Sequence, residues 1–138
     1  MSHLFLIFIQ IQIENFIHQY SVVQLNFYVN SSNNILLYPL QSIFYTEAGE
    51  TSLVFFRLVN LSNYNYSILT TYTIFPQLAS IYVNKLQCFC FEMIHIKPQE
   101  ELNLPVVFFI SDRLTVDFPS LRQILLYYDV HKFQQYDL

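Results

Sequence analysis

The chain has 138 residues, of which 54% are hydrophobic, 18% aromatic and only 12% charged. A typical soluble domain is about 25% charged, so this chain must bury much of its surface or present apolar surface to partners. A net charge of −4 with only six Lys and Arg argues against a nucleic-acid-binding protein, because that function needs clustered basic residues. The length predicts one domain with a hydrophobic core.

The residue usage points to the kind of gene that encodes the chain. Phe, Tyr, Ile, Asn and Leu are abundant and there is a single glycine. These are residues with AT-rich codons, and we hypothesise an organellar gene. Two cysteines do not make the disulfide framework of a small secreted domain.

The N-terminal segment 1–21 opens with its most apolar run at 4–13. A membrane-spanning helix needs ~20 apolar residues, and this run is shorter and is interrupted by Gln10 and Gln12. From Phe8 onward apolar and polar residues alternate, which favours a strand or an interfacial segment rather than a full transmembrane helix. We therefore expect residues 22–138 to form the folded domain.

Short runs of strand-forming residues follow, separated by turn residues. Thr51–Asn60 is the clearest, with strand formers on both faces. Gly49 lies in the turn before it, where we expect a positive φ, and Pro105 predicts an edge strand or a bulge. Strands at a spacing of ~8–12 residues predict an all-β sandwich. We expect these strands at 22–29, 35–38, 43–45, 51–60, 66–75, 85–96, 102–110 and 121–130, with loops at 77–84 and 111–120.

Both cysteines lie one residue apart, at Cys88 and Cys90. On a β-strand, alternate side chains share a face, so the two thiols would project together with Glu92. The opposite face would carry the side chains that we expect in the core: Phe89, Phe91 and Met93.

Two adjacent thiols allow three interpretations from the residues alone. Thiolates favour Cu(I), which accepts two or three sulfur ligands, whereas a structural zinc site wants four ligands at wider spacing. Alternate strand positions lie at the edge of disulfide reach, so a bridge between them would be strained and redox-active. The third interpretation is that each cysteine is a small buried hydrophobe.

The residues around the two cysteines, Asn84-Lys85-Leu86-Gln87-Cys88-Phe89-Cys90-Phe91-Glu92, resemble the signature of the CtaG family. The members of that family are the copper-delivering assembly proteins of cytochrome c oxidase. The resemblance runs from about residue 23 to 131. The supporting elements are Asn26, Pro39-Leu40-Gln41, Gly49-Glu50-Thr51, Phe55-Phe56-Arg57, Tyr72, Pro76, the turn 97–101, the run 104–110 and Leu126-Tyr127-Tyr128.

The resemblance implies an immunoglobulin-like β-sandwich that binds Cu(I) through Cys88 and Cys90. It implies a chaperone that delivers copper to the catalytic subunit of cytochrome c oxidase during assembly, at the intermembrane-space side of the mitochondrial inner membrane. In the family two domains are thought to share copper at a dimer contact, so a homodimer through the Cys face is expected. The family usually carries a transmembrane helix before this domain, and here we expect membrane association through partner proteins.

The alternative is a permanent structural accessory subunit of the oxidase or of a respiratory supercomplex, in contact with other respiratory-complex subunits. A thiol oxidoreductase is a third hypothesis. His95 is a weak candidate for a third metal ligand, and Lys85, Arg57 and Arg122 are candidates for docking an acidic partner. The sequence shows no nucleophile elbow, phosphate loop, zinc-protease motif or dinucleotide fingerprint, and we expect no enzymatic activity.

Overall fold

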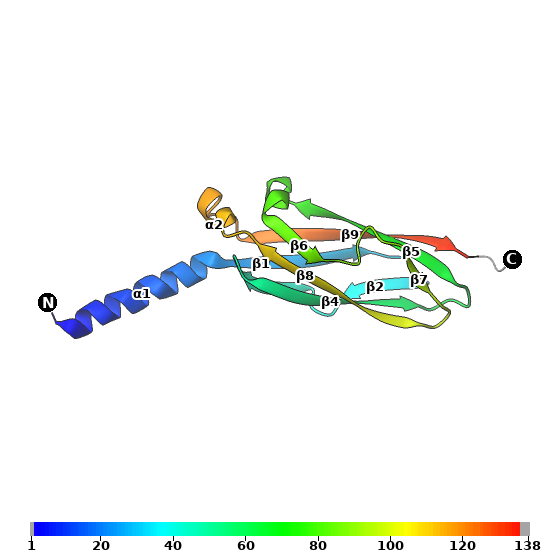
Figure 1. The fold of residues 1–138 in the computed structure, drawn as a ribbon, viewed down its shortest axis with the longest axis horizontal. Helices are drawn as coiled ribbons and strands as arrows, with labels where there is room; N and C mark the ends of the chain where they lie inside the picture. The colour runs from blue at the N-terminus through cyan, green and yellow to red at the C-terminus, as the bar shows by residue number, and fades with distance from the viewer. Residues whose placement is uncertain (1, 136–138) are drawn as a thin grey trace.

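The computed structural model describes residues 2–135, with the exception of the side chains of 13–20. Two β-sheets pack face to face, and one helix projects from an end of the sandwich along its long axis (Figure 1). The elements in chain order are α1 (His3–Ser21), β1 (Val22–Asn30), β2 (Ile35–Pro39), β3 (Ile43–Glu47), β4 (Thr51–Asn60), β5 (Tyr66–Phe75), the 3₁₀ helix η1 (Gln77–Tyr82), β6 (Val83–Gln87), β7 (Ile94–Ile96), β8 (Glu101–Ile110), α2 (Arg113–Asp117) and β9 (Gln123–Gln134).

The strand order is β3-β1-β9-β5-β7 in one sheet and β2-β4-β8-β6 in the other. All pairs are antiparallel except β1 with β9, which run parallel. Consecutive strands such as β4 and β5, or β6 and β7, belong to different sheets. The predicted immunoglobulin-like β-sandwich is confirmed.

The core lies between the sheets and is built from alternate residues of the long strands. On β4, Val54, Phe56 and Leu58 are buried, as the period of two requires. The Phe56 ring contacts Phe27 of β1, with ring centroids 5.5 Å apart, and Tyr128 of β9, with centroids 4.9 Å apart. Strand β4 therefore runs as the sequence predicts, from Thr51 to Asn60.

The N-terminal segment is the helix α1, so of the two alternatives that we expected there the strand was wrong, and the interfacial segment stays a prediction. Ser2 caps it by accepting a hydrogen bond from the Phe5 N–H at 3.3 Å. A helix satisfies its backbone hydrogen bonds internally, whereas a strand needs a neighbour. Within residues 2–135 we find no helix with the length and apolarity to cross a membrane.

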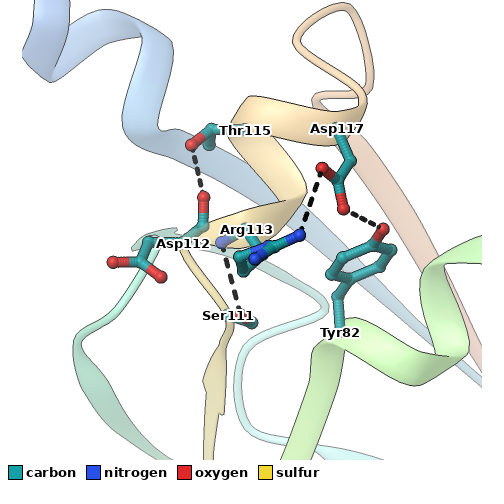
Figure 2. A network of polar contacts seen from close by, with 6 residues as sticks. All are labelled: Tyr82, Ser111, Asp112, Arg113, Thr115 and Asp117. Carbon is teal, nitrogen blue, oxygen red and sulfur yellow. Dashed lines mark hydrogen bonds and ion pairs between the residues drawn. The ribbon is translucent and has the colours of Figure 1, made fainter.

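Two segments that we expected to be loops contain helices. The segment 77–84 forms η1, and α2 lies within 111–120. Figure 2 shows that the two helices are joined, because the Tyr82 hydroxyl of η1 donates to Asp117 of α2 at 2.6 Å. Within α2, Arg113 lies 3.9 Å from the same carboxylate. The hydrogen bond to Asp117, followed by burial, raises the pKa of Tyr82.

Gly49 and Pro105 show how turn and breaker residues are placed. Gly49 has a φ of 87°, and the expectation of a positive φ is confirmed. Pro105 lies on β8, which is an inner strand between β4 and β6 and pairs with β4 without a register shift. Neither the edge strand nor the bulge that we expected is found there, but the physical reason for the expectation is met at the proline itself. Strand β6 pairs with β8 only as far as Val107, and the proline therefore has a strand neighbour only on the β4 side.

Candidate metal centre

The two cysteines lie in a turn, and not on a strand as the alternation had indicated. Strand β6 pairs with β8 from Val83 to Gln87, with a register shift between Lys85 and Gln87, and the chain leaves the sheet at Cys88. The turn at 88–93 carries the chain from the edge of one sheet to β7 at the edge of the other.

The turn brings the two sulfurs together. Cys88 and Cys90 form a disulfide, with their Cα atoms 5.2 Å apart. Alternate residues of a strand would be about 6.7 Å apart at the usual rise per residue, at the limit of disulfide reach. Contraction of the chain in the turn is therefore what places the pair well within bonding range.

The predicted faces of this segment were wrong in two of three positions. Phe89 is in the core, 7% exposed, with its ring centroid 5.3 Å from that of Phe56 and 6.1 Å from that of Tyr128. Phe91 and Met93 are 60% and 53% exposed. A turn does not keep the period of two, and so the three side chains do not share a face.

Phe91 holds the far side of the turn against β5. Its N–H donates to the carbonyl oxygen of Thr70 at 2.8 Å. Its ring meets the ring of Tyr72 edge-on, with centroids 5.3 Å apart. Phe91 has a φ of 62°, in the left-handed region that bulky L residues rarely adopt.

Lys85 holds the near side of the turn, and its side chain points between the sheets instead of toward solvent. Its Nζ donates to the Tyr128 hydroxyl at 2.9 Å, lies 3.1 Å from the Tyr72 ring centroid, and is 3.9 Å from Cys88 Sγ. Burial lowers the pKa of Lys85 to about 7, while the ring faces favour its charged form. Burial, with a smaller contribution from Tyr72, raises the pKa of Tyr128.

The expectation that Lys85 serves as a docking charge was therefore wrong. Alternation along β6 could have predicted the inward direction of the Lys85 side chain. Lys85 lies two residues after Val83, and both side chains are half-buried on the same side of the strand. Tyr72 and Tyr128 were noted only as parts of the family resemblance. Tyr128 lies 43 positions after Lys85, and the sequence does not reveal a contact between residues so far apart.

The sulfur pair lies at the boundary between core and surface. Cys90 is buried, Cys88 is half-buried, and the Cys90 N–H donates to Cys88 Sγ at 3.2 Å. Glu92 is exposed. Of the two cysteines only Cys88 is partly accessible, and Lys85 and the Cys90 amide present N–H groups to its sulfur.

His95 does not join the cysteines. Its Nδ1 lies 2.9 Å from the Ser67 hydroxyl and 2.7 Å from Gln135 Nε2. Among the side chains that the structure describes, those of residues 2–12 and 21–135, no group of three or more His, Cys, Asp or Glu is arranged to hold a metal ion. Cys88 and Cys90 are therefore the candidate ligands that the described part of the chain brings together here.

Comparison with known proteins identifies the family. The family model described as cytochrome c oxidase assembly protein CtaG/Cox11 matches residues 10–132. The chain belongs to this family. The resemblance that the sequence motif indicated is therefore confirmed, over a range slightly longer than the motifs had suggested.

Relatives with assigned names agree with the family model. The chain is 40% identical over 87 residues to the cytochrome c oxidase assembly protein ctaG of Reclinomonas americana, an alignment that covers 63% of this chain and 47% of the relative. It is 42% identical over 79 residues to the mitochondrial assembly protein COX11 of Homo sapiens, covering 57% and 29%. It is 31% identical over 116 residues to the COX11 protein of Arabidopsis thaliana, covering 83% and 40%. The chain thus spans less than half the length of each of these CtaG/Cox11 relatives.

Proposed function

We propose that this CtaG/Cox11 protein binds Cu(I) through Cys88 and Cys90 and delivers it to the catalytic subunit of cytochrome c oxidase during assembly. The observation that carries the proposal is that an anchored turn at the edge of the sandwich, with Cys88 half-buried and Cys90 buried, holds the chain's two cysteines within bonding distance of each other. Soft monovalent copper is the ion that such a pair of thiolates prefers.

Copper binding needs the reduced pair. Reduction of the disulfide by a thiol reductant adds two electrons and two protons, and the thiols then lose protons as the ion binds. The N–H groups of Lys85 and Cys90 are placed to offset the charge of a Cys88 thiolate. Two sulfurs leave Cu(I) with room for a further ligand, so an incoming group of the acceptor can displace them by ligand exchange.

A second copy of the chain is the natural source of the missing ligands. The turn lies at the edge of the sandwich, between β6 and β7, and not in a closed cavity. Two such turns can therefore approach each other, and a homodimer through the Cys face would supply four sulfurs.

The names of several relatives place them in mitochondria, and we propose the inner membrane, on the intermembrane-space side, for this chain. The role is a non-catalytic one, with membrane association through oxidase partners.

Copper titration of the reduced protein tests the proposal. Under anaerobic conditions the wild-type chain should retain about one Cu(I) per cysteine pair, or one per two pairs in a dimer, against a competing chelator. Cys88→Ser and Cys90→Ser should each abolish retention. His95→Ala is the matched control, since His95 contacts Ser67 and Gln135 instead of the sulfurs. Stoichiometric copper in the double serine variant would show the proposal to be wrong.

A second candidate function, a permanent accessory subunit of the oxidase, is favoured by a different surface. Part of the outer face of the β2-β4-β8-β6 sheet is apolar, with Leu53 49% and Phe55 41% exposed on β4. Opposite them in register are Val107 and Pro105 on β8. An exposed apolar patch marks an interaction site, and a permanent partner would cover it.

The outer face of the other sheet is mixed, because Tyr28 of β1 is 65% exposed and stacks on Tyr127 of the neighbouring strand β9. The same face carries polar side chains on the neighbouring strands β1, β9 and β5, among them Gln24, Asn26, Gln123, Asp129 and Thr73. Purification under native conditions separates the two functions. A permanent subunit should remain with the oxidase in a fixed ratio, and Leu53→Glu should release it, whereas a delivery protein should purify away from the mature enzyme.

A further inference from the structure

Tyr72 on β5 lies at the centre of the contacts that hold the cysteine turn. Lys85 Nζ lies 3.1 Å from the centroid of its ring, and the Phe91 ring meets it edge-on at 5.3 Å between centroids. Lys85 precedes the cysteines and Phe91 follows them. A single ring therefore contacts both arms of the loop that carries the sulfurs.

Hydrogen bonds on neighbouring positions fasten the same two arms. Phe91 N–H donates to the Thr70 carbonyl oxygen at 2.8 Å, and Lys85 Nζ donates to the Tyr128 hydroxyl at 2.9 Å. Tyr128 is the residue directly opposite Tyr72 in the pairing of β5 with β9. The loop thus rests on one small region of the sheet.

The conformation of Phe91 shows that these contacts constrain the loop. A φ of 62° is unfavourable for a side chain of this size. Such a conformation persists only when the surrounding contacts determine it. A ring at position 72 is one of those contacts, and the hydrogen bond to Thr70 is another.

We propose that Tyr72 is a positioning residue for the sulfur pair: by contacting Lys85 and Phe91 at once, it restrains residues 85–91 and keeps Cys88 and Cys90 near enough for their sulfurs to form the disulfide or, once reduced, to move apart and hold one Cu(I) between them. A group held in place loses less conformational freedom when it reacts or binds, so its equilibrium constants are larger. The copper part of this inference rests on the proposed function, and the disulfide part does not.

Equilibration with glutathione, a monothiol, measures the disulfide part. Two glutathione molecules reduce the Cys88–Cys90 bond: that S–S bond breaks, its sulfurs gain two electrons and two protons, and the two glutathione sulfurs become joined in a disulfide. In Tyr72→Leu we expect the equilibrium constant for forming the Cys88–Cys90 disulfide to fall about tenfold, equivalent to about 1.4 kcal/mol. We expect the Cu(I) affinity of the reduced variant, measured by chelator competition, to fall by a similar factor.

Two variants serve as controls. Tyr72→Phe keeps the ring and should leave both equilibrium constants within about twofold of wild type. Tyr28→Leu removes a tyrosine that is 65% exposed on the outer face of the same sheet, two strands from β5, and that stacks on Tyr127 with centroids 6.5 Å apart. It should change neither constant. Thermal unfolding of each variant reports stability separately.

The direction of the two shifts decides the outcome. A parallel fall in disulfide formation and Cu(I) affinity supports positioning, because both need the sulfurs together. A folded Tyr72→Leu with both constants unchanged would overturn it, and so would shifts of opposite sign, which indicate an effect of charge on the sulfurs. If Tyr72→Leu does not fold, Phe91→Leu removes one of the two ring contacts and should give the same parallel fall, of smaller size. A disulfide shift in a protein that binds no Cu(I) would remove the copper function and retain the positioning role.

Discussion

Strand β4 and the cysteine turn are both segments of alternating large side chains, and they fold differently. In β4 the alternation is kept, so that Phe56 is buried and Phe55 is exposed. In the turn, Phe89 is buried and Phe91 is exposed, although they are two residues apart. The difference lies in the neighbours: β4 is paired on both sides, by β2 and β8, whereas the chain after Gln87 has left its ladder with β8. Alternation alone does not make a strand where the backbone has no partner.

The comparison is tested most strongly on β4, by removal of one buried ring and of the exposed ring next to it. Phe56→Ala removes a fully buried ring that contacts Phe27, Phe89 and Tyr128. We expect the free energy of unfolding to fall by about 3–5 kcal/mol, as for other buried aromatic residues. Phe55→Ala on the same strand should cost under about 1 kcal/mol. Chemical denaturation of the disulfide form measures both, and equal losses would contradict the assigned faces of β4.

In the turn, removal of the buried ring and of the exposed ring should give a similar contrast in the free energy of unfolding. Phe89→Ala should lower the free energy of unfolding by about 3 kcal/mol, because its ring packs on Phe56 and Tyr128. Phe91→Ala should lower it by about 1 kcal/mol or less, since the Phe91 ring is 60% exposed and its edge-on contact with Tyr72 is the ring contact that is lost. If Phe91→Ala were the more damaging of the two, the strand interpretation with Phe91 in the core would be restored.

The charged residue of each segment gives a test by pH. Arg57 of β4 makes an exposed hydrogen bond to Asn103 at 3.2 Å, whereas Lys85 is buried enough for its pKa to fall from 10.5 to about 7. Between pH 7 and pH 10.5 Lys85 is protonated in the unfolded chain and largely neutral in the folded chain, so the free energy of unfolding should rise with pH. We expect a gain of about 1–2 kcal/mol from pH 7 to pH 9 in the disulfide form. Lys85→Met should remove most of the rise, and a rise of unchanged size in that variant would contradict the buried position of Lys85.

Glycine should have opposite effects in the two segments. At position 91 the backbone is left-handed, so Phe91→Gly should be more stable than Phe91→Ala by about 1 kcal/mol. At position 55, in a regular strand, Phe55→Gly should be less stable than Phe55→Ala by about 0.5–1 kcal/mol. Denaturation midpoints of the four variants measure the difference. The same sign at both positions would show that residues 88–93 are extended in solution.

The sequence allows prediction of the sandwich because its strands carry their own pattern. The bounds of β4 and β5 agree with the runs of strand formers, and the positive φ of Gly49 follows from its place in a turn. The family follows from the residues around Cys88 and Cys90, and the match to residues 10–132 confirms it.

The geometry around the sulfurs could not be predicted, because it depends on contacts between distant segments. The turn forms where the β6–β8 pairing ends, and its position is determined by Thr70, Tyr72 and Tyr128 on two strands of the other sheet. The helical state of residues 3–21 was missed for a related reason. Alternation suggested a strand, but a strand would have needed a neighbour that the segment lacks in this fold.

X-ray absorption at the copper K-edge of the reduced, Cu(I)-loaded protein tests the central claim most directly. We predict a Cu(I) edge with a first shell made of sulfur alone, unchanged in His95→Ala and lost in the Cys88→Ser, Cys90→Ser double variant. A first shell of nitrogen or oxygen ligands, or the same spectrum in the double variant, would contradict the assignment of the cysteine turn as the copper site.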